Sequence, residues 1–553
     1  MHNEDVHLLS REPEQPGRDV GHDVARQGAE GRGESALAVA EIGWHGDEAQ
    51  GGNGDNGDEE DELVELVDRV GTTPLHWMCV GILGLANAAD AVEVLAIGYI
   101  VTVFRDPVSG ERIDEMPGWS ALLTSAVFAG MLIGGLVSGA MGDRFGRKPL
   151  LTLSLAVNAC AAMVSALTPL LPGRIQIGWL VFFRLIGGLG VGGSVPTVFA
   201  LASELGPEKT RSLFINVVAS FWSAGVMYTS LCAYLFLHGQ GGEDRWPYFA
   251  AMVALPGTLA ACLSLCKLEE SPVFLWSNGR SHQAGKVLLR FLESRRDLET
   301  AEVETLRDHI EIAAVTCKNG EAERMQMHRI SGALALFVNL KKLFEHRSTR
   351  RTTMLVSSIY FFLSFAHYGI SSWISDLFLK IHFSDPYITS VFYTLATIPG
   401  LLGATLLVDR LGRRATTAGA MGLACVSALM FALNTSNRVY VKIFAGLFNC
   451  FAACTWNAFD VFSTESFPAS LRASGIGLGT ACGRVGSVVA NVYNGFVLAS
   501  GASGAGDAAH VATVLLSAAA SMLCGAAAAF LLPETLGART VRIRAARSLD
   551  AVQ

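Results

Sequence analysis

Charged residues are scarce in this 553-residue chain: they make up 17% of it, whereas hydrophobic residues make up 51%. A composition this apolar excludes an ordinary soluble protein. No Gly-x-x-x-x-Gly-Lys-Ser/Thr phrase is present, which argues against direct use of ATP. No nucleophile–base set and no cluster of metal ligands appears either. The sequence therefore does not indicate an enzyme, and we expect neither a cofactor nor a metal ion.

Disulfide bonds and a dinucleotide site are also not expected. Every cysteine except Cys317 falls within an apolar stretch, where packing explains it. Residues 188–193 match the Gly-x-Gly-x-x-Gly fingerprint, but they lie inside a long apolar stretch and not between a soluble strand and a helix. We interpret these glycines as small residues that let two membrane helices approach closely.

Lysine is absent from residues 1–70, which hold 19 Asp and Glu but only five Arg. Such a segment has little to bury, so we predict a disordered acidic tail, either regulatory or a plain solvated extension. Its acidity argues against a nucleic acid as partner. It lacks the pattern of a secretory signal, so the first membrane span is expected to direct targeting.

Twelve segments are apolar and long enough to cross a membrane as helices, since about 20 mostly apolar residues span the hydrocarbon layer. The first six are residues 77–104, 119–141, 149–171, 177–202, 213–237 and 247–268. The second six are residues 352–379, 387–408, 415–434, 439–462, 473–499 and 509–532. The predicted fold is all-α and integral to the membrane, with twelve transmembrane helices in two pseudo-symmetric six-helix bundles.

The same pattern predicts the domain organisation. Its parts are an acidic tail (1–70), an N-terminal bundle (71–268), a linker (269–351), a C-terminal bundle (352–533) and a basic tail (534–553). Arg and Lys concentrate after the second, fourth, eighth and tenth spans, so the positive-inside rule makes both termini and the linker cytoplasmic. Apolar residues at helical spacing around Leu288 and Phe291, flanked by Arg and Lys, predict short linker helices along the cytoplasmic face.

A short charged phrase occurs twice, each time after a long apolar span. It reads Asp143-Arg144-Phe145-Gly146-Arg147 and, 266 residues later, Asp409-Arg410-Leu411-Gly412-Arg413. A second phrase, Glu-x-x-Pro-x-x-x-Arg, runs from Glu204 to Arg211 and again from Glu465 to Arg472. Two unrelated phrases repeated in the same order indicate a duplicated membrane protein.

The repeated phrases also suggest a cytoplasmic gate. The four arginines of the first phrase can pair with Glu204 and Glu465, and Asp143 and Asp409 can lie against helix N-termini of the opposite half. Such pairs would form when the cytoplasmic side is shut. The alternative is that basic turns merely determine topology, but repetition with matched acids favours the gate. The predicted gate residues are Asp143, Arg144, Gly146, Arg147, Glu204, Arg211, Asp409, Arg410, Gly412, Arg413, Glu465 and Arg472.

Charged side chains inside the predicted spans are candidates for binding. Asp90 and Glu93 share one helix face near the bilayer middle, where a carboxylate is costly unless it is paired, protonated or facing water. They either bind a cation or a coupling proton, or form structural pairs with a neighbouring arginine. Arg184 can neutralise one of them, and structural pairing and proton handling are equally open to it.

The second half offers further candidates. Arg484, within the eleventh span, can attract a substrate carboxylate or close the cytoplasmic gate. His367 lies beside Tyr368 and is followed by Trp373, so it can titrate or stack on a ring, although a lone histidine in a span is more often a packing residue.

The motifs together resemble a known superfamily over nearly everything between residues 63 and 537. Residues 139–148 resemble the loop 2–3 signature of the major facilitator superfamily. Residues 184–193, 204–211, 270–272 and 533–537 resemble its sugar-porter and organic-ion branch, and residues 89–93, 368–369, 464–472 and 483–486 resemble the synaptic vesicle glycoprotein 2-related group. The resemblance implies twelve helices and a central site worked by alternating access. The Gln-rich phrase that sugar porters carry in their seventh span is absent, which argues against a sugar.

We therefore expect a secondary active transporter, a symporter that moves a small organic ion together with a proton. The leading expectation is a small aromatic or pyridine carboxylate, met by Arg484 and coupled through Asp90 and Glu93. The alternatives are an organic cation, then a sugar, then a transporter-like receptor or scaffold. We expect a monomer in the lipid bilayer of the plasma membrane or of an intracellular vesicle or vacuole.

Overall fold

The computed structural model of the chain is built almost wholly from helices and describes residues 63–239, 241–295, 300–316, 340–383, 385–499 and 507–535. The first half contains α3 (Pro74–Val101), α4 (Pro117–Phe145), α5 (Arg147–Ser165), α6 (Ile175–Leu205), α7 (Glu208–Leu237) and α8 (Gly242–Lys267). Two 3₁₀ turns, η1 (Ile113–Glu115) and η2 (Thr168–Leu170), lie in its loops.

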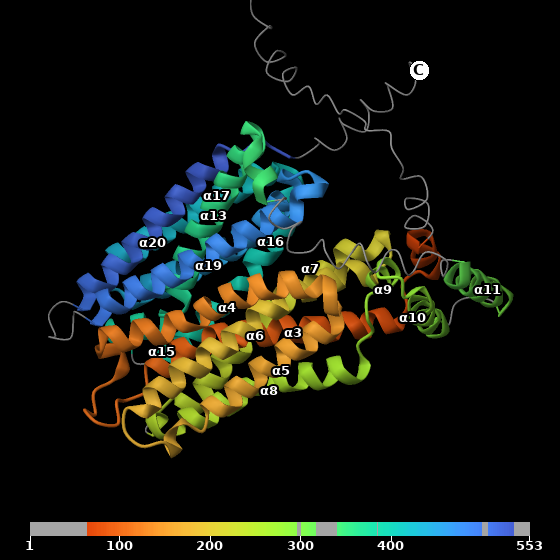
Figure 1. Cartoon of the computed structure of the whole chain (residues 1–553). Coiled ribbons are helices and arrows are strands. Elements are labelled where there is room, and N and C mark those ends of the chain that lie inside the picture. Colours follow the sequence, from red (N-terminus) through yellow and green to blue (C-terminus); the bar gives the residue numbers. More distant parts are fainter. Residues whose placement is uncertain are drawn as a thin grey trace, which may run out of the picture. The chain divides into compact units, whose positions relative to one another are not determined.

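The second half contains α13 (Arg347–Ser371), α14 (Ile374–Lys380), α15 (Pro386–Leu395), α16 (Thr397–Leu411), α17 (Arg413–Leu433), α18 (Arg438–Ser466), α19 (Ala469–Ala499) and α20 (Asp507–Phe530). Figure 1 shows the two halves as separate groups of helices, orange to yellow-green and cyan to blue. The predicted seventh span is broken into α13 and α14 at Ser372 and Trp373, and the eighth is built from α15 and α16.

Eleven helical segments of the described residues are long and apolar enough to cross a membrane. They correspond in order to eleven of the twelve predicted spans. The remaining predicted span, residues 473–499, coincides with α19, a 31-residue helix that packs against α13 and α4.

Glycines allow close helix packing within the first half. A Cβ at Gly188 would overlap the Val127 carbonyl of α4, and one at Gly192 would overlap the Met131 carbonyl. A Cβ at Gly190 would come within 2.6 Å of the Ser154 carbonyl of α5. The interpretation of this phrase as a packing stripe is therefore confirmed, because α6 lies directly against α4 and α5 at these positions.

We call the end of the helices that carries the Gly146 and Gly412 turns the basic end, and the opposite end the far end. The two halves are in contact at the far end. Thr102 of α3 hydrogen-bonds Tyr387 of α15 at 3.2 Å, and His238 lies 2.7 Å from Asp385. The structure is therefore closed at the far end.

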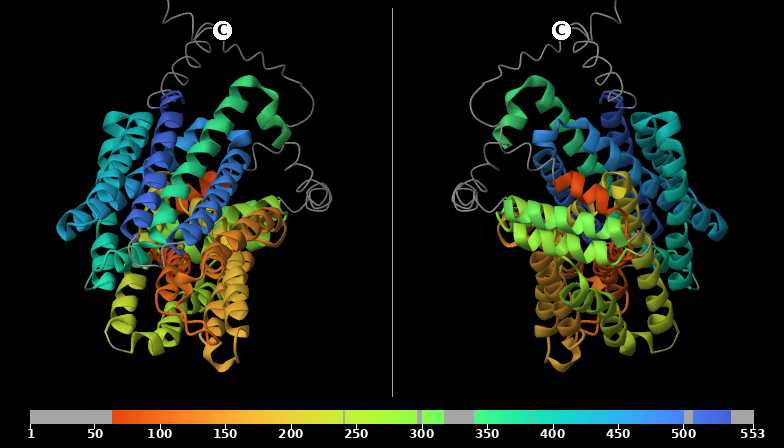
Figure 2. Two further views of the ribbon diagram at one scale, coloured as in Figure 1. Left: turned by 90° about the vertical axis from the view of Figure 1, so that its left-hand side faces the viewer. Right: turned by 90° about the vertical axis from the view of Figure 1, so that its right-hand side faces the viewer.

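The linker helices form a small cluster with a segment that precedes α3. Residues 63–70 are helical, and their apolar side chains pack with those of α9 (Pro272–Ser277), α10 (Ser281–Glu293) and α11 (Thr300–Thr316) (Figure 2). Assigning all of residues 1–70 to a solvated tail was therefore wrong for the last eight of them. Leu63, Leu66, Val67 and Val70 recur at helical spacing and are buried. Residues 1–62 and 536–553 lie outside the described residues.

The first prediction concerns contact at the far end. A Cβ at Gly98 of α3 would overlap the carbonyl of Ser372 after α13, so Gly98→Ala should prevent far-end closure. We expect a longer distance between spin labels at Val108 and Leu433, measured by pulsed electron spin resonance with the native cysteines replaced. Gly81→Ala is the matched control, because nothing lies within 4 Å of a Cβ at that position of the same helix. Equal distances in the two variants would contradict this role for Gly98.

Candidate functional site

Asp90 is buried in the middle of α3 and bound to α6. Both of its carboxylate oxygens accept from the Ser194 hydroxyl, at 2.8 and 2.7 Å. Glycines precede Ser194 on α6, and their lack of side chains lets α6 approach its neighbours closely. The Arg484 guanidinium, which comes from the other half, acts electrostatically on the Asp90 carboxylate.

Glu93 lies one turn further along α3 and has a different partner. Arg184 of α6 donates to it at 2.8 Å and to the Ser165 hydroxyl at 2.9 Å, and both charged side chains are buried. Gly187 makes room for the glutamate, because a Cβ there would lie 2.6 Å from a carboxylate oxygen. Within the described residues, Glu93 Oε2 and Arg184 Nε have no hydrogen-bond partner. The pair is therefore buried but incompletely satisfied.

Arg484 of α19 projects between the two halves. Its guanidinium carbon lies 5.6 Å from the centre of the Tyr368 ring, a cation–π contact. Tyr368 in turn packs against Phe128 of α4 at 5.2 Å and against Trp456 of α18 at 5.9 Å. Arg484 is half-buried, and no hydrogen bond or ion pair among the described residues engages it. The site thus has a cation without a bound anion beside a set of aromatic rings.

His367 is held by two hydrogen bonds in a neutral form. Trp456 donates its indole N–H to Nδ1 at 2.8 Å, and Asn449 Oδ1 lies 3.3 Å from Nε2. Because the indole only donates, Nδ1 must accept, and the ring proton is on Nε2. Protonating Nδ1 would break the bond to Trp456, so this geometry favours the packing role of His367 over titration.

Trp373 lies apart from this group. Its ring is fully buried after α13, and its N–H donates to Asn491 at 3.0 Å. The structure therefore brings together Asp90, Arg484 and Tyr368, places Glu93 and Arg184 beside them, and leaves Trp373 as a packing residue near the far end.

The repeated turns at the basic end have the same construction in both halves. Gly146 and Gly412 have φ of 103° and 91°, a backbone conformation that residues with a Cβ rarely adopt. The next residue begins a helix in each case. Arg147 lies 3.4 Å from Glu204, and Arg413 lies 3.1 Å from Glu465. Each of these ion pairs joins helices of the same half.

Two acids that were not predicted as gate residues complete these turns. Glu270 accepts from the backbone N–H groups of Arg147 and Lys148 at 3.1 Å, and Glu534 accepts from those of Arg413 and Arg414 at 2.9 and 3.1 Å. A carboxylate at a helix N-terminus is favoured by unpaired N–H groups and by the helix dipole. Burial raises the pKa of Glu270 above its ordinary value, although the backbone N–H donors oppose that shift. The sequence repeat could have revealed these capping acids, because each of them follows the sixth span of its half.

The remaining predicted gate residues are less constrained. Arg144 and Arg410 are exposed, and Asp409 pairs with Arg413 of its own turn at 3.1 Å. The expectation that Asp409 lies against a helix N-terminus of the opposite half is therefore wrong for this conformation, because its side chain is 77% exposed and bound to Arg413. The side chain of Asp143 lies outside the described set.

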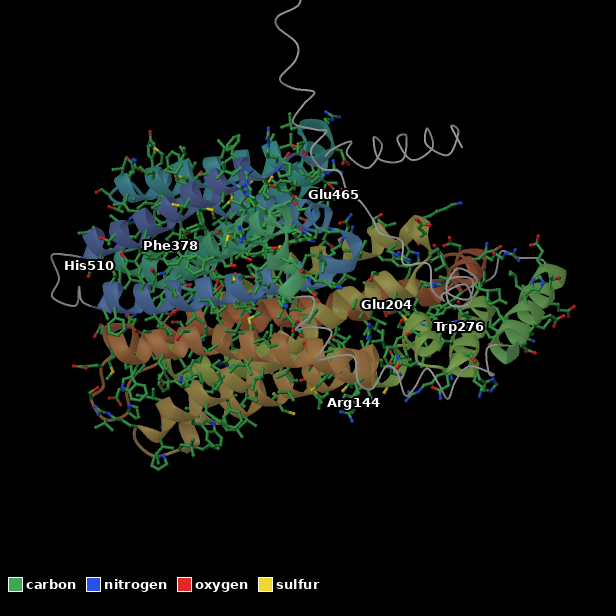
Figure 3. All side chains as sticks on the ribbon, turned by 45° about the horizontal axis from the view of Figure 1, so that its top comes forward. Arg144, Glu204, Trp276, Phe378, Glu465 and His510 are labelled. Carbon is green, nitrogen blue, oxygen red and sulfur yellow. The ribbon has the colours of Figure 1, made fainter. Side chains whose placement is uncertain are left out.

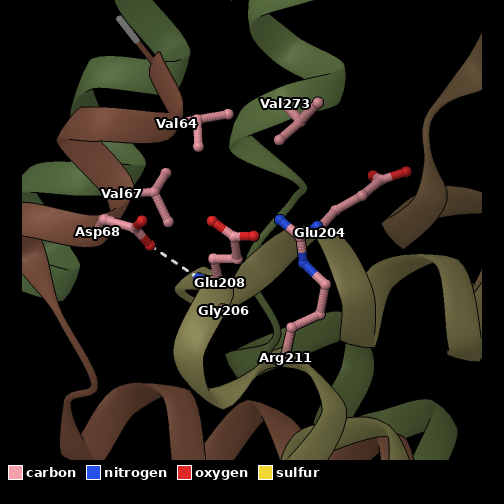
Figure 4. A pocket seen from close by; sticks show the side chains of 8 residues that line it. All are labelled: Val64, Val67, Asp68, Glu204, Gly206, Glu208, Arg211 and Val273. Atoms are coloured by element: carbon pink, nitrogen blue, oxygen red, sulfur yellow. Dashed lines mark hydrogen bonds between the residues drawn. The ribbon is translucent and has the colours of Figure 1, made fainter. Parts of the chain in front are cut away.

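Arg211 and Arg472 are exposed near the start of α7 and of α19. Arg211 lines a small pocket together with Glu204 and Glu208 (Figure 4). In the same figure Asp68 accepts from the backbone N–H of Glu208 at 2.8 Å, so the segment before α3 caps α7. Figure 3 places Arg144, Glu204 and Glu465 toward the basic end, and Phe378 and His510 toward the other end.

No group of three or more His, Cys, Asp or Glu side chains within the described ranges is arranged to hold a metal ion.

Comparisons with known proteins agree on one kind of protein. The family profile described as "Sugar (and other) transporter" matches residues 94–546. The niacin transporter NiaP of Acinetobacter baylyi is 28% identical over 420 residues, covering 75% of this chain and 86% of that protein. Synaptic vesicle glycoprotein 2A of Rattus norvegicus is 23% identical, covering 83% of this chain and 77% of that protein. The partially occluded inward open conformation of the xylose transporter XylE from E. coli has a TM-score of 0.62 at 15% identity, covering 82% of this chain and 98% of that one.

The second prediction concerns the turns at the basic end. Gly412→Ala should lower the stability by about 1–3 kcal/mol, because the backbone there is one that essentially only glycine adopts. A Cβ would also come within 2.7 Å of the Glu534 carboxylate. Thermal unfolding in detergent measures the effect. Gly419→Ala in α17 is the control, since nothing surrounds a Cβ there and alanine favours a helix. If Gly412→Ala proves as stable as the control, the turn does not require glycine.

Proposed function

This chain belongs to the sugar (and other) transporter family of the major facilitator superfamily, and on that premise we propose that it moves a small organic carboxylate across the membrane together with protons. The superfamily, the helical membrane fold and the transporter class that the sequence predicts are confirmed, and the chain is not an enzyme. The carboxylate, the coupling and the roles of individual residues are our proposal.

The observation that carries the proposal is the state of Arg484. A half-buried guanidinium with no hydrogen bond or ion pair among the described residues is costly, because it loses hydration without gaining a partner. A carboxylate that enters between the halves would supply that partner through charge-assisted, bidentate hydrogen bonds. Arg484 is therefore the group that binds the charge of the substrate.

The rings beside Arg484 favour a flat substrate. The Tyr368 ring lies against the guanidinium, and Phe128 and Trp456 pack on Tyr368, so this group of rings can stack on an aromatic substrate. A small aromatic or pyridine carboxylate presents both features, a ring and one negative charge. Niacin, which the name of one relative mentions, is itself a pyridine carboxylate.

Asp90 links this binding to protons. While Asp90 is ionised, its negative charge neutralises part of the field of Arg484 and repels an incoming carboxylate. A proton on Asp90 removes that repulsion, so the protonated transporter binds the anion more tightly. By linkage, the bound anion also favours proton binding at Asp90, and the two travel together. Glu93 and Arg184 neutralise one another and hold α3 and α6 in register beside Asp90.

The rival substrates are less well supported. An organic cation would have Arg484 as a repulsive neighbour, and Glu93 is already paired with Arg184. The sugar named in the neighbouring structure is not carried over, since 15% identity supports the fold alone. A receptor or scaffold would have no use for charges buried between the halves. An uptake panel in which no small solute enters would favour that last alternative.

We place the basic end on the cytoplasmic side, in accordance with the positive-inside rule, with both termini there. The protein works as a monomer. Since Arg147–Glu204 and Arg413–Glu465 lie within single halves, each cluster lets its half move as one body. In the state closed at the cytoplasmic side, the exposed Arg144, Arg211, Arg410 and Arg472 face acids of the opposite half.

The third prediction concerns the substrate charge. Arg484→Gln should weaken binding of pyridine carboxylates roughly 10- to 100-fold, since hydrogen bonds to a charged group contribute about 1.5–3 kcal/mol. Binding of the neutral amide of the same ring should change little. Calorimetric titration of the purified protein compares the two ligands. Arg351→Gln, which removes an exposed arginine of the same half, is the control. Equal losses for acid and amide would rule out Arg484 as the carboxylate-binding group.

The fourth prediction concerns the coupling. In proteoliposomes, Asp90→Asn should abolish accumulation driven by a pH gradient but keep exchange of labelled for unlabelled substrate, because the amide imitates the protonated acid. Asp90→Asn combined with Glu93→Gln should behave in the same way if Glu93 is only structural. Unchanged accumulation in the double variant would refute coupling at this pair of acids.

A further inference from the structure

Two carboxyl groups from opposite halves meet at the far end. Asp114 belongs to η1 in the first half, and Asp376 belongs to α14 in the second; their side chains are 2% and 0% exposed. Lys380, one turn after Asp376 on α14, lies 3.9 Å from the Asp114 carboxylate, so α14 brings the buried Asp376 close to Asp114. An ionised carboxylate only accepts hydrogen bonds, so two ionised groups in contact repel each other. A proton shared between them would remove that repulsion.

The neighbouring cations show where that proton resides. Arg112 donates to both oxygens of Asp114, at 3.0 and 2.9 Å, and the Lys380 ammonium lies 3.9 Å from the same carboxylate. Both oxygens of Asp376 lack a hydrogen-bond partner within the described residues. These contacts stabilise negative charge on Asp114 and leave Asp376 as the acid that is suited to hold a proton.

The other titratable groups nearby have partners or lie at the surface. Tyr99 of α3 hydrogen-bonds Ser230, and Tyr387 of α15 hydrogen-bonds Thr102. Glu115 of η1 is exposed. The start of α20, which also packs on α14, carries Asp507 and His510, and Asp385 pairs with His238.

We propose that Asp114 and Asp376 form a proton-binding site that operates the far-end gate. When the far end closes, one proton is taken up and shared as an Asp376 O–H donating to the Asp114 carboxylate. When it opens, that contact breaks and the proton returns to water on the same side. The pair thus makes closure depend on pH without carrying protons across. This side is extracellular if the orientation proposed above is correct. The proposal of the proton site itself does not depend on the identity of the substrate or on proton coupling at Asp90.

A second pair at the far end must be removed to observe this site alone. His238 and Asp385 also join the halves, and their attraction requires a protonated histidine. The experiment therefore uses the full chain with His238→Gln.

Spin labels at Val108 and Leu433 report the far-end distance in lipid nanodiscs without substrate, from mildly acidic to mildly alkaline pH. Over the pH range in which the open state has released the proton and the closed state still holds it, the closed-to-open ratio should fall about tenfold per pH unit. Adding Asp376→Asn should leave the gate closed across the range, because the amide donates to Asp114 without a proton being bound. Asp114→Asn should also keep the gate closed across the range, because its amide would then donate to the Asp376 carboxylate. Glu115→Gln, an exposed neighbour of Asp114, should leave the slope intact.

A slope that survives Asp376→Asn would overturn the proposal, as would a wild-type ratio that does not change with pH. A ratio that follows sodium concentration at fixed pH would overturn it too, by identifying a metal cation in place of the proton. Thermal unfolding checks that each variant is folded. If only one of the two Asn variants folds, that variant alone is sufficient for the test. Failure of the proposed transport function would appear in Asp90→Asn and Arg484→Gln and leave this slope unchanged.

Discussion

The cost of placing charge inside an apolar bundle is the constraint on which the rest of this structure depends. Each buried charge must find an opposite charge or hydrogen-bond donors, because hydrocarbon offers neither. Glu93 meets this demand with Arg184, and Asp90 meets it with the Ser194 hydroxyl. Among the described residues Arg484 makes no hydrogen bond or ion pair; it contacts the Tyr368 ring and faces Asp90 across the boundary between the halves. Because Arg484 lacks an ionic or hydrogen-bonding partner among the described residues, the boundary between the halves is suited to reversible binding of an anion.

The location of the strong contacts explains how the two halves can move. At the basic end, carboxylates cap α5 and α17, and arginines bind acids of their own half, so each half is braced internally. At the far end, the two halves are joined by the hydrogen bond between Thr102 and Tyr387 and by the close packing of Gly98 against the Ser372 carbonyl. Breaking the far-end contacts therefore separates two bodies whose internal packing stays intact. That division is the physical requirement for opening a bundle alternately to its two sides.

Local patterns predicted much of this arrangement, and what they missed depends on tertiary contact. Apolar runs predicted the spans, and the repeated phrases predicted Gly146, Gly412 and their arginines, because a turn is encoded within a few residues. The carboxylate caps were missed since Glu270 and Glu534 lie more than a hundred residues from the helices they cap. Asp376 was overlooked for the same reason: it stands at the end of an apolar run, and only contact between the halves gives it Asp114 as a neighbour. Spacing placed Asp90 and Glu93 on one face, yet it did not show that they take different partners on α6.

The two proton sites that we propose for this chain have different consequences. A proton held between Asp114 and Asp376 enters and leaves on one side, because opening that gate is what exposes it. It can bias the conformational equilibrium but cannot move charge across the membrane. A coupling proton must instead be bound where either opening can reach it, and Asp90 lies at the boundary of the halves near Arg484. Under the proposed function, substrate selection by charge and proton coupling both depend on Asp90 and Arg484, whereas the far-end acids affect only the pH at which the gate closes.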